Sequence, residues 1–180
     1  MTEPFWLTRQ MVVAIHDEQL TIHGGASGLR DEGMLESALD RPRNRWSYEQ
    51  ADLAELAAAY AFGIARNHPF VDGNKRTSLL ALYTFLGVND VDFVVPEAEA
   101  AAIILSLAAG EVSEESLTRW IRDNWPAEPS NSGAWRARRR CPSVRFAVFP
   151  RQTRIPTEDT NGRAQRSRLH DRRRQRLPGP

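Results

Sequence analysis

Two apolar helical patterns joined by one short polar break are the feature that most constrains the fold of this chain. Residues 53–67 and 73–87 each place apolar side chains at the three- and four-residue spacing of a buried helical face. Pro69 ends the first pattern, and Gly87 is the expected C-cap of the second. The sequence therefore predicts two core helices that meet at a break beginning at His68. The expected buried stripes are Leu53, Leu56, Ala57, Tyr60, Ala61 and Ile64 in the first helix and Leu79, Leu82, Tyr83 and Leu86 in the second.

Four further helices are expected from capping residues and helix breakers. A capping side chain begins three of them, and Pro96 takes the first helical position of the other. Together with the core helices, they predict an all-α bundle of about six helices with the polar break between the third and the fourth. These four helices are expected at residues 8–21, 31–39, 96–110 and 113–126, with Thr8, Asp31 and Ser113 as the capping residues.

Two segments between the helices lack a sustained helical pattern. Pro42 is expected to end the helix that begins at Asp31, so residues 41–50 (RPRNRWSYEQ) predict a loop or a small hairpin. Residues 91–95 (VDFVV) alternate briefly between apolar and polar side chains, which indicates an extended segment.

The polar break, residues 68–77 (HPFVDGNKRT), combines side chains suited to proton transfer and to phosphate binding. The imidazole of His68 is well suited to proton transfer near neutral pH, although a lone histidine more often binds the carbonyl groups at a helix end. Asp72 is a hard oxygen ligand for magnesium or, alternatively, the N-cap of an ordinary Asp-Gly turn. Phe70 is expected to be a buried anchor, and Thr77 is expected to support the start of the next helix by capping.

The first turn of the following helix predicts a phosphate-binding cradle. Free N–H groups and the helix dipole attract anions there, and Gly73 lets the backbone approach a ligand closely. Asn74, Lys75 and Arg76 add an amide, a point charge and a forked donor. Lys75 is the only lysine among the 24 Lys and Arg residues of the chain. The structural alternative is an ion pair between Asp72 and Arg76 at helical spacing.

Charge is divided unevenly along the chain, although its net charge is only +1. Residues 1–127 contain 10 Lys and Arg against 19 Asp and Glu, whereas residues 128–180 contain 14 Arg against 4 Asp and Glu. The first part is expected to be one globular domain. The second part lacks a sustained period and is expected to be a disordered basic tail. A nucleic-acid-binding arm and an extension that has lost its original reading frame are the alternatives.

The polar break closely resembles the signature of the Fic/Doc family, and within it that of the death-on-curing (Doc) toxins of type II toxin–antitoxin systems. The signature is a His, a Pro or similar residue, Phe, any residue, an acid, a small residue, Asn, then Gly or Lys, and Arg. The resemblance extends over residues 4–126, which makes residues 1–127 a Fic/Doc (Fido) domain and leaves out the basic tail. The matching residues are His68, Pro69, Phe70, Val71, Asp72, Gly73, Asn74, Lys75 and Arg76.

Two departures from the adenylylating (Fic) branch of the family favour a different reaction. That branch has Gly at the position of Lys75 and a second Arg at the position of Leu79. The Gly lets a nucleotide diphosphate lie against the helix start, and the second Arg holds it. The resemblance to Doc toxins implies an inverted ATP and transfer of its γ-phosphate to a threonine of elongation factor Tu, which halts translation and growth. A protein adenylyltransferase is the alternative.

The resemblance also implies roles for individual residues. His68 would be the general base, and Asp72 would hold Mg²⁺ and help to orient His68. Residues 41–50 would form the flap that aligns a target peptide, with a solvated loop as the alternative. The residues expected to bind the phosphates of ATP are Gly73, Asn74, Lys75 and Arg76.

The implied partner is a small Phd-like antitoxin whose disordered C-terminal segment folds on the toxin. No apolar run reaches the roughly 18 residues of a membrane span and no signal peptide is visible, so a cytoplasmic protein without membrane contact is expected. The single cysteine, Cys141, excludes an intramolecular disulfide. The alternative from another class is a weakly catalytic binding protein whose basic tail contacts nucleic acid.

Overall fold

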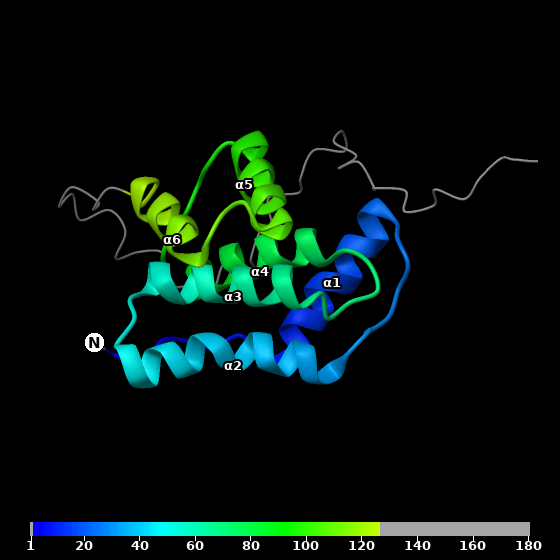
Figure 1. Cartoon of the computed structure of the whole chain (residues 1–180), viewed down its shortest axis with the longest axis horizontal. Helices are drawn as coiled ribbons and strands as arrows, with labels where there is room; N and C mark the ends of the chain where they lie inside the picture. The colour runs from blue at the N-terminus through cyan, green and yellow to red at the C-terminus, as the bar shows by residue number, and fades with distance from the viewer. Residues whose placement is uncertain (1, 127–180) are drawn as a thin grey trace, which may run out of the picture. The chain divides into compact units, whose positions relative to one another are not determined.

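Six helices and no regular strand make up residues 2–126, the part of the chain that the computed structural model describes (Figure 1). The all-α fold predicted from the sequence is confirmed, and the polar break lies between the third and fourth helices. None of these helices is long and apolar enough to cross a membrane. The predicted basic tail, residues 128–180, lies outside the described residues. The helices are α1 (Arg9–His23), α2 (Glu32–Glu49), α3 (Leu53–Asn67), α4 (Asn74–Val88), α5 (Glu97–Ala109) and α6 (Glu114–Asp123).

Helix α3 lies at the centre of this fold and packs against α2, α4, α5 and α6. In Figure 1, α2 runs along one side of α3, and α5 and α6 lie on the opposite side. Ten of the 15 residues of α3 are buried, many of them alanines that allow neighbouring helices to approach closely. The predicted stripes of α3 and α4 are buried except at Leu53 and Tyr83, which are partly exposed.

Helix α2 does not end where the sequence predicts. The expected end at Leu39, caused by Pro42, and the expected loop or hairpin at residues 41–50 are both wrong. The helix continues to Glu49, with Pro42 buried inside it. A proline has no N–H, so the Ala38 carbonyl oxygen loses its helical donor. Tertiary contacts on both sides of the proline offset this loss.

The second half of α2 is fastened to the start of α6 by a buried carboxylate. Glu114 is only 4% exposed, and it accepts hydrogen bonds from Arg41 Nε at 2.9 Å and from Arg45 Nη1 at 2.8 Å. The two arginines are four residues apart, so a helix brings both to the same carboxylate. Because a buried charge is costly unless it is paired, this arrangement favours helix over loop between the two arginines.

The first half of α2 packs on α3 at a close crossing between Ala38 and Gly63. A Cβ atom on Gly63 would lie 3.0 Å from Ala38 Cα and 3.2 Å from the Ala38 carbonyl oxygen. Any side chain larger than hydrogen would therefore separate the two helices. Close packing at this point and ion pairing beyond the proline together hold α2 as one helix.

The remaining boundaries differ from the prediction by small amounts. Pro96 is the N-cap of α5 instead of its first residue. The C-cap of helix α4 is Asn89, two residues beyond Gly87, the C-cap that the sequence predicts. Residues 91–95 form no strand. The side chains predicted to cap α1, α2 and α6 accept backbone hydrogen bonds as expected, and they are Thr8, Asp31 and Ser113.

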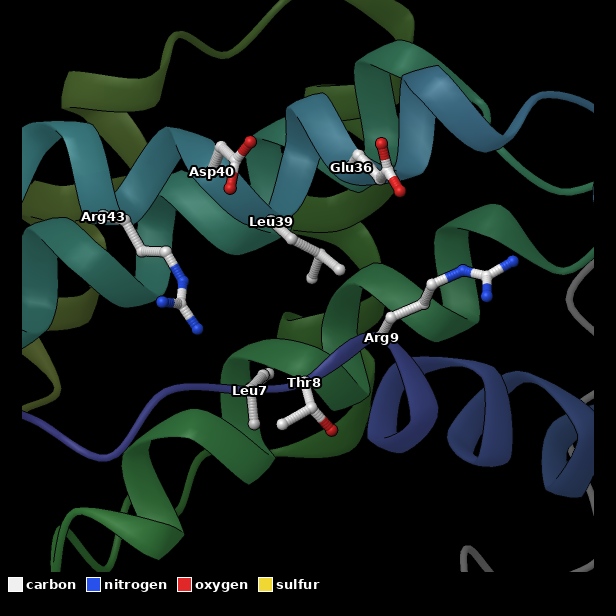
Figure 2. A pocket seen from close by; sticks show the side chains of 7 residues that line it. All are labelled: Leu7, Thr8, Arg9, Glu36, Leu39, Asp40 and Arg43. Atoms are coloured by element: carbon white, nitrogen blue, oxygen red, sulfur yellow. The ribbon is translucent and has the colours of Figure 1, made fainter.

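Two surface cavities lie beside α2. The first, of about 320 Å³, lies between α2 and residues 7–9, and Figure 2 shows Leu39 and Arg43 of α2 pointing toward residues 7–8. The second, of about 400 Å³, lies over Glu114 and its two arginines. Neither cavity is lined by residues of the polar break.

The buried carboxylate should matter more to stability than an exposed one that shares an arginine with it. We expect Glu114→Gln to lower the free energy of unfolding by about 2–4 kcal/mol, because two guanidinium groups lose their buried partner. Glu49→Gln is the control, because Glu49 contacts Arg45 at 2.8 Å but is 56% exposed, and its loss should cost less than about 0.5 kcal/mol. Urea unfolding measures both, and equal losses would contradict the role given to Glu114.

Candidate active site

His68 closes α3 in the left-handed region of backbone conformation, with φ 48° and ψ 56°. Its backbone N–H donates to the Ile64 carbonyl oxygen at 3.3 Å, so the backbone satisfies this helix-end carbonyl. Burial lowers the pKa of the imidazole below its ordinary value of 6.5, and the positive charges of Arg30, Lys75 and Arg66 lower the pKa further. The ring is therefore neutral at neutral pH and able to accept a proton.

The side chain of Asn74 closes the turn between α3 and α4. Its Oδ1 accepts from the Phe70 N–H at 2.9 Å, and its Nδ2 donates to the Phe70 carbonyl oxygen at 2.8 Å. Phe70 is 1% exposed and is the buried anchor that the sequence predicts. Because the side chain holds the turn, only the backbone N–H of Asn74 is left for the phosphate-binding role expected of this residue.

Residues 28–31 border this turn along one side. Two N–H groups of this segment donate to the Pro69 carbonyl oxygen, at 2.7 and 3.1 Å. In return, the Val71 N–H donates to the Gly28 carbonyl oxygen at 3.0 Å. The structure thus places residues 28–31 beside the turn, where residues 41–50 had been expected as a flap.

The carboxylate of Asp72 is constrained by three neighbours but is still 39% exposed. Its Oδ1 accepts from the Gly73 N–H at 2.6 Å and lies 4.0 Å from Arg76 Nη2. Gly25 passes so close that a Cβ atom on it would lie 2.5 Å from Asp72 Oδ2. Within residues 2–126 no hydrogen bond joins Asp72 to His68, so the expected orientation of the imidazole by this carboxylate is not observed.

Helix α4 begins without a side-chain cap. Gly73 is its N-cap, with φ 75°, and Thr77 N–H donates back to the Gly73 carbonyl oxygen at 2.9 Å. The N–H groups of residues 74–76 precede that bond and have no helical acceptor, so they can bind an anion. The expected capping by Thr77 is wrong, because its side chain is fully buried and its hydroxyl has no hydrogen-bond partner in the described part of the chain.

The two cations of this first turn are held differently. Arg76 is only 15% exposed and donates to the Gly24 carbonyl oxygen at 3.3 Å, which ties it to the loop after α1. Lys75 is partly exposed, and its side-chain ammonium makes no hydrogen bond or ion pair with residues 2–126. Its ammonium is therefore free to bind an added anion beside the uncapped helix start.

Asp72 fits magnesium only in combination with a phosphate. Residues 2–126 contain no group of three or more His, Cys, Asp or Glu side chains that could hold a metal ion. Magnesium, however, is commonly bound by one or two carboxylates together with water and substrate phosphates. A part-exposed carboxylate directly before an anion-binding helix start provides that donor set.

Three residues of the site were not identified from the sequence, and they are His16, Gly25 and Arg30. His16 comes from α1, is 1% exposed, and stacks on Phe70 with the ring centroids 3.9 Å apart. Its spacing of four residues from Val12, which is also buried, is the sequence signal that could have placed it on the inner face of α1.

The sequence of this chain is similar to a known protein family and to two named proteins. Residues 6–86 match the sequence model of the Fic/DOC family. The chain is 35% identical over 117 residues to "Protein kinase doc" of Escherichia phage P1, a match that covers 64% of this chain and 92% of the relative. It is also 44% identical over 82 residues to "Toxin Doc" of Mycolicibacterium smegmatis, covering 42% of this chain and 63% of that relative.

Gly25 should be required for the position of the Asp72 carboxylate. We expect Gly25→Ala to displace that carboxylate, because the new Cβ would lie 2.5 Å from Oδ2. The Gly73 amide should then lose its bond to Oδ1, which faster amide exchange and a changed proton shift would report. Gly24→Ala is the control, since its φ of 72° is also unfavourable for alanine but its Cβ would meet nothing within 4 Å. If both variants left the Gly73 amide unchanged, the proposed constraint would be refuted.

Proposed function

The chain belongs to the Fic/DOC family, and on that premise we propose that it is the toxin of a toxin–antitoxin pair and phosphorylates a threonine of its target with ATP. One observation carries the proposal, namely the uncapped start of α4, where three N–H groups and the unpaired Lys75 follow Asp72 directly. The relative named as a protein kinase supports phosphoryl transfer, and the relative named as a toxin supports the toxin role.

His68 accepts the proton of the attacking hydroxyl. Its lowered pKa keeps the imidazole neutral at neutral pH, so a ring nitrogen can take the proton. As the proton leaves, the threonine oxygen forms a bond to the γ-phosphorus, and the bond from that phosphorus to ADP breaks. The products are phosphothreonine and ADP.

The start of α4 stabilises the charge on the group that is transferred. Phosphoryl transfer spreads negative charge over three oxygens, and its catalysis consists mostly of positioning and electrostatic stabilisation. The N–H groups of residues 74–76, the Lys75 ammonium and the Arg76 guanidinium supply positive charge there. Asp72 would hold a magnesium ion, which when bound would neutralise charge on the phosphates.

Two residues support phosphate transfer over AMP transfer. Leu79 is only 6% exposed, so it is part of the core and offers no charge where the adenylylating branch has its second Arg. Lys75 fills the place of the glycine against which that branch lays a nucleotide diphosphate. ATP should therefore bind with its γ-phosphate, instead of its α-phosphate, at the helix start.

Elongation factor Tu is the target that we propose, and a Phd-like antitoxin that folds on binding is the proposed partner. Both come from the family resemblance. Residues 1–127 carry 19 acidic against 10 basic side chains, which suits a basic or amphipathic antitoxin segment. The alternative function, binding of nucleic acid by residues 128–180, involves a part of the chain that lies outside the described residues.

Incubation with ATP, Mg²⁺ and elongation factor Tu should add one phosphoryl group to the target. We expect Lys75→Gly to slow this reaction about 100-fold, because the ammonium group that would stabilise negative charge on the phosphoryl oxygens in the transition state is lost. Intact mass of the target, followed over time, measures both the product and the rate.

Three further variants separate the possible causes of such a loss. Lys75→Met keeps the side-chain length without the charge and should be as slow as Lys75→Gly, whereas Lys75→Arg should retain more activity. His68→Ala should abolish the reaction. A target heavier by one AMP would identify an adenylyltransferase instead, and an unchanged rate in Lys75→Gly would refute the role of the lysine.

The pH profile should report the cations around His68. Because the pKa of His68 is lowered, the imidazole takes up its proton at a lower pH than an ordinary histidine, so the midpoint of the acid limb of kcat/KM should lie below pH 6.5. Arg30→Gln removes one cation that lowers this pKa, so the pKa should rise and the acid limb should move to higher pH. Arg119→Gln, an exposed arginine on α6, is the control and should leave the limb in place. A limb that does not move in Arg30→Gln would contradict His68 as the base.

A further inference from the structure

His16 is a buried polar residue for which the proposed reaction has no use. It lies in the middle of α1 and is 1% exposed. Its Nε2 lies 3.1 Å from the carbonyl oxygen of Asp72, which is 56 residues away in the sequence. Its ring stacks on Phe70 with an angle of 9° between the ring planes, and its Nδ1 lies 3.3 Å from Asp17 Oδ1.

The contact with His16 acts on a single peptide unit. The Asp72 carbonyl and the Gly73 N–H belong to one planar trans peptide and so point in opposite directions. The carbonyl end meets His16 Nε2, and the N–H end donates to Asp72 Oδ1 at 2.6 Å. The imidazole also lies against Gly73, where a Cβ atom would be 3.4 Å from His16 Cδ2. The peptide unit from which α4 begins is therefore held at both ends.

We propose that His16 is a positioning residue for the Asp72–Gly73 peptide unit. A carbonyl oxygen can only accept a hydrogen bond, so Nε2 of His16 carries the hydrogen. Rotation of this peptide unit would turn the Gly73 N–H away from the carboxylate and redirect the first N–H groups of α4. Through this one bond, α1 sets the direction of both the Asp72 carboxylate, proposed to bind magnesium, and the first N–H groups of α4, proposed to bind phosphate. The effect on reaction rate rests on the proposed function, whereas the hydrogen bond does not.

The hydrogen bond is tested first in the unmodified full-length chain. With the histidine rings labelled with ¹⁵N, NMR should find a slowly exchanging hydrogen on His16 Nε2 and scalar coupling from that nitrogen to the Asp72 carbonyl carbon. A ring that carries its hydrogen on Nδ1 alone would overturn the proposal, because Nε2 could not then donate. This measurement needs no target, no ATP and no variant.

Two variants then separate the donor from the ring. His16→Phe keeps a ring that can stack on Phe70 but removes the donor, whereas His16→Gln loses the ring and places an amide N–H near the position of Nε2. A purely structural role predicts that the Gln variant is worse in every respect, because it packs less well. If His16 positions the peptide unit, the ranking by stability is the reverse of the ranking by activity. The Phe variant is then the more stable and the Gln variant the more active.

The expected activity difference follows from the sensitivity of catalysis to geometry. We expect His16→Phe to lower kcat for phosphoryl transfer about tenfold or more, and His16→Gln to stay within about threefold of the unmodified protein. Amide exchange in residues 70–76 should be faster in the Phe variant and close to normal in the Gln variant. His23→Gln, at the exposed end of the same helix, is the control and should change neither readout.

The outcomes distinguish this inference from the proposed function. If activity and amide protection follow stability, with Phe above Gln, the inference is overturned. If the unmodified protein phosphorylates nothing, the proposed function fails, and the amide exchange and the NMR coupling still decide the role of His16. If the Phe variant does not fold, the coupling in the unmodified protein decides it alone.

Discussion

Burial of α3 is the constraint on which the rest of the described fold depends. Two thirds of its residues are hidden from solvent, and a helix buried on several faces needs a partner on each of them. Helices α2, α4, α5 and α6 are those partners. The same packing holds the end of α3 in place. His68, the C-cap of α3, therefore has a defined position in the fold. Helix α4 packs against α3. His68 at the end of α3 and residues 74–76 at the start of α4 are therefore both held by the two central helices.

The turn between these two helices holds backbone conformations that need support from their surroundings. His68 and Gly73 both have positive φ, and such residues persist where neighbouring contacts determine them. The contacts come from three directions. Asn74 closes the turn from inside, residues 28–31 pair with its outer edge, and His16 holds the peptide that enters α4. The proposed phosphoryl transfer would benefit from this support, because the groups that catalyse such a reaction act mainly by their position.

The start of α4 keeps positive charge that carboxylates of the described residues do not fully pair. The domain has an excess of acidic side chains, and many of its arginines are paired, as Arg41 and Arg45 are with Glu114 and Arg122 is with Asp52. Lys75 has no such partner in residues 2–126, and Arg76 reaches its nearest carboxylate only at 4.0 Å. After burial and Arg30, the Lys75 charge is a further cause of the lowered pKa of His68. The same charge is available to an anion.

Six helices, the capping side chains of α1, α2 and α6 and the break at Pro69 follow from the sequence alone, because each depends on residues within a few positions of one another. Phosphate binding at residues 73–76 is a prediction from the same local pattern. Only the tertiary structure decided three other features. Helix α2 continues through Pro42 because Glu114, about 70 residues away, pairs with two of its arginines. Residues 28–31, instead of 41–50, border the site, and His16 holds a peptide 56 residues away. Local periodicity carries no information about such distant partners, since they meet only when the helices pack.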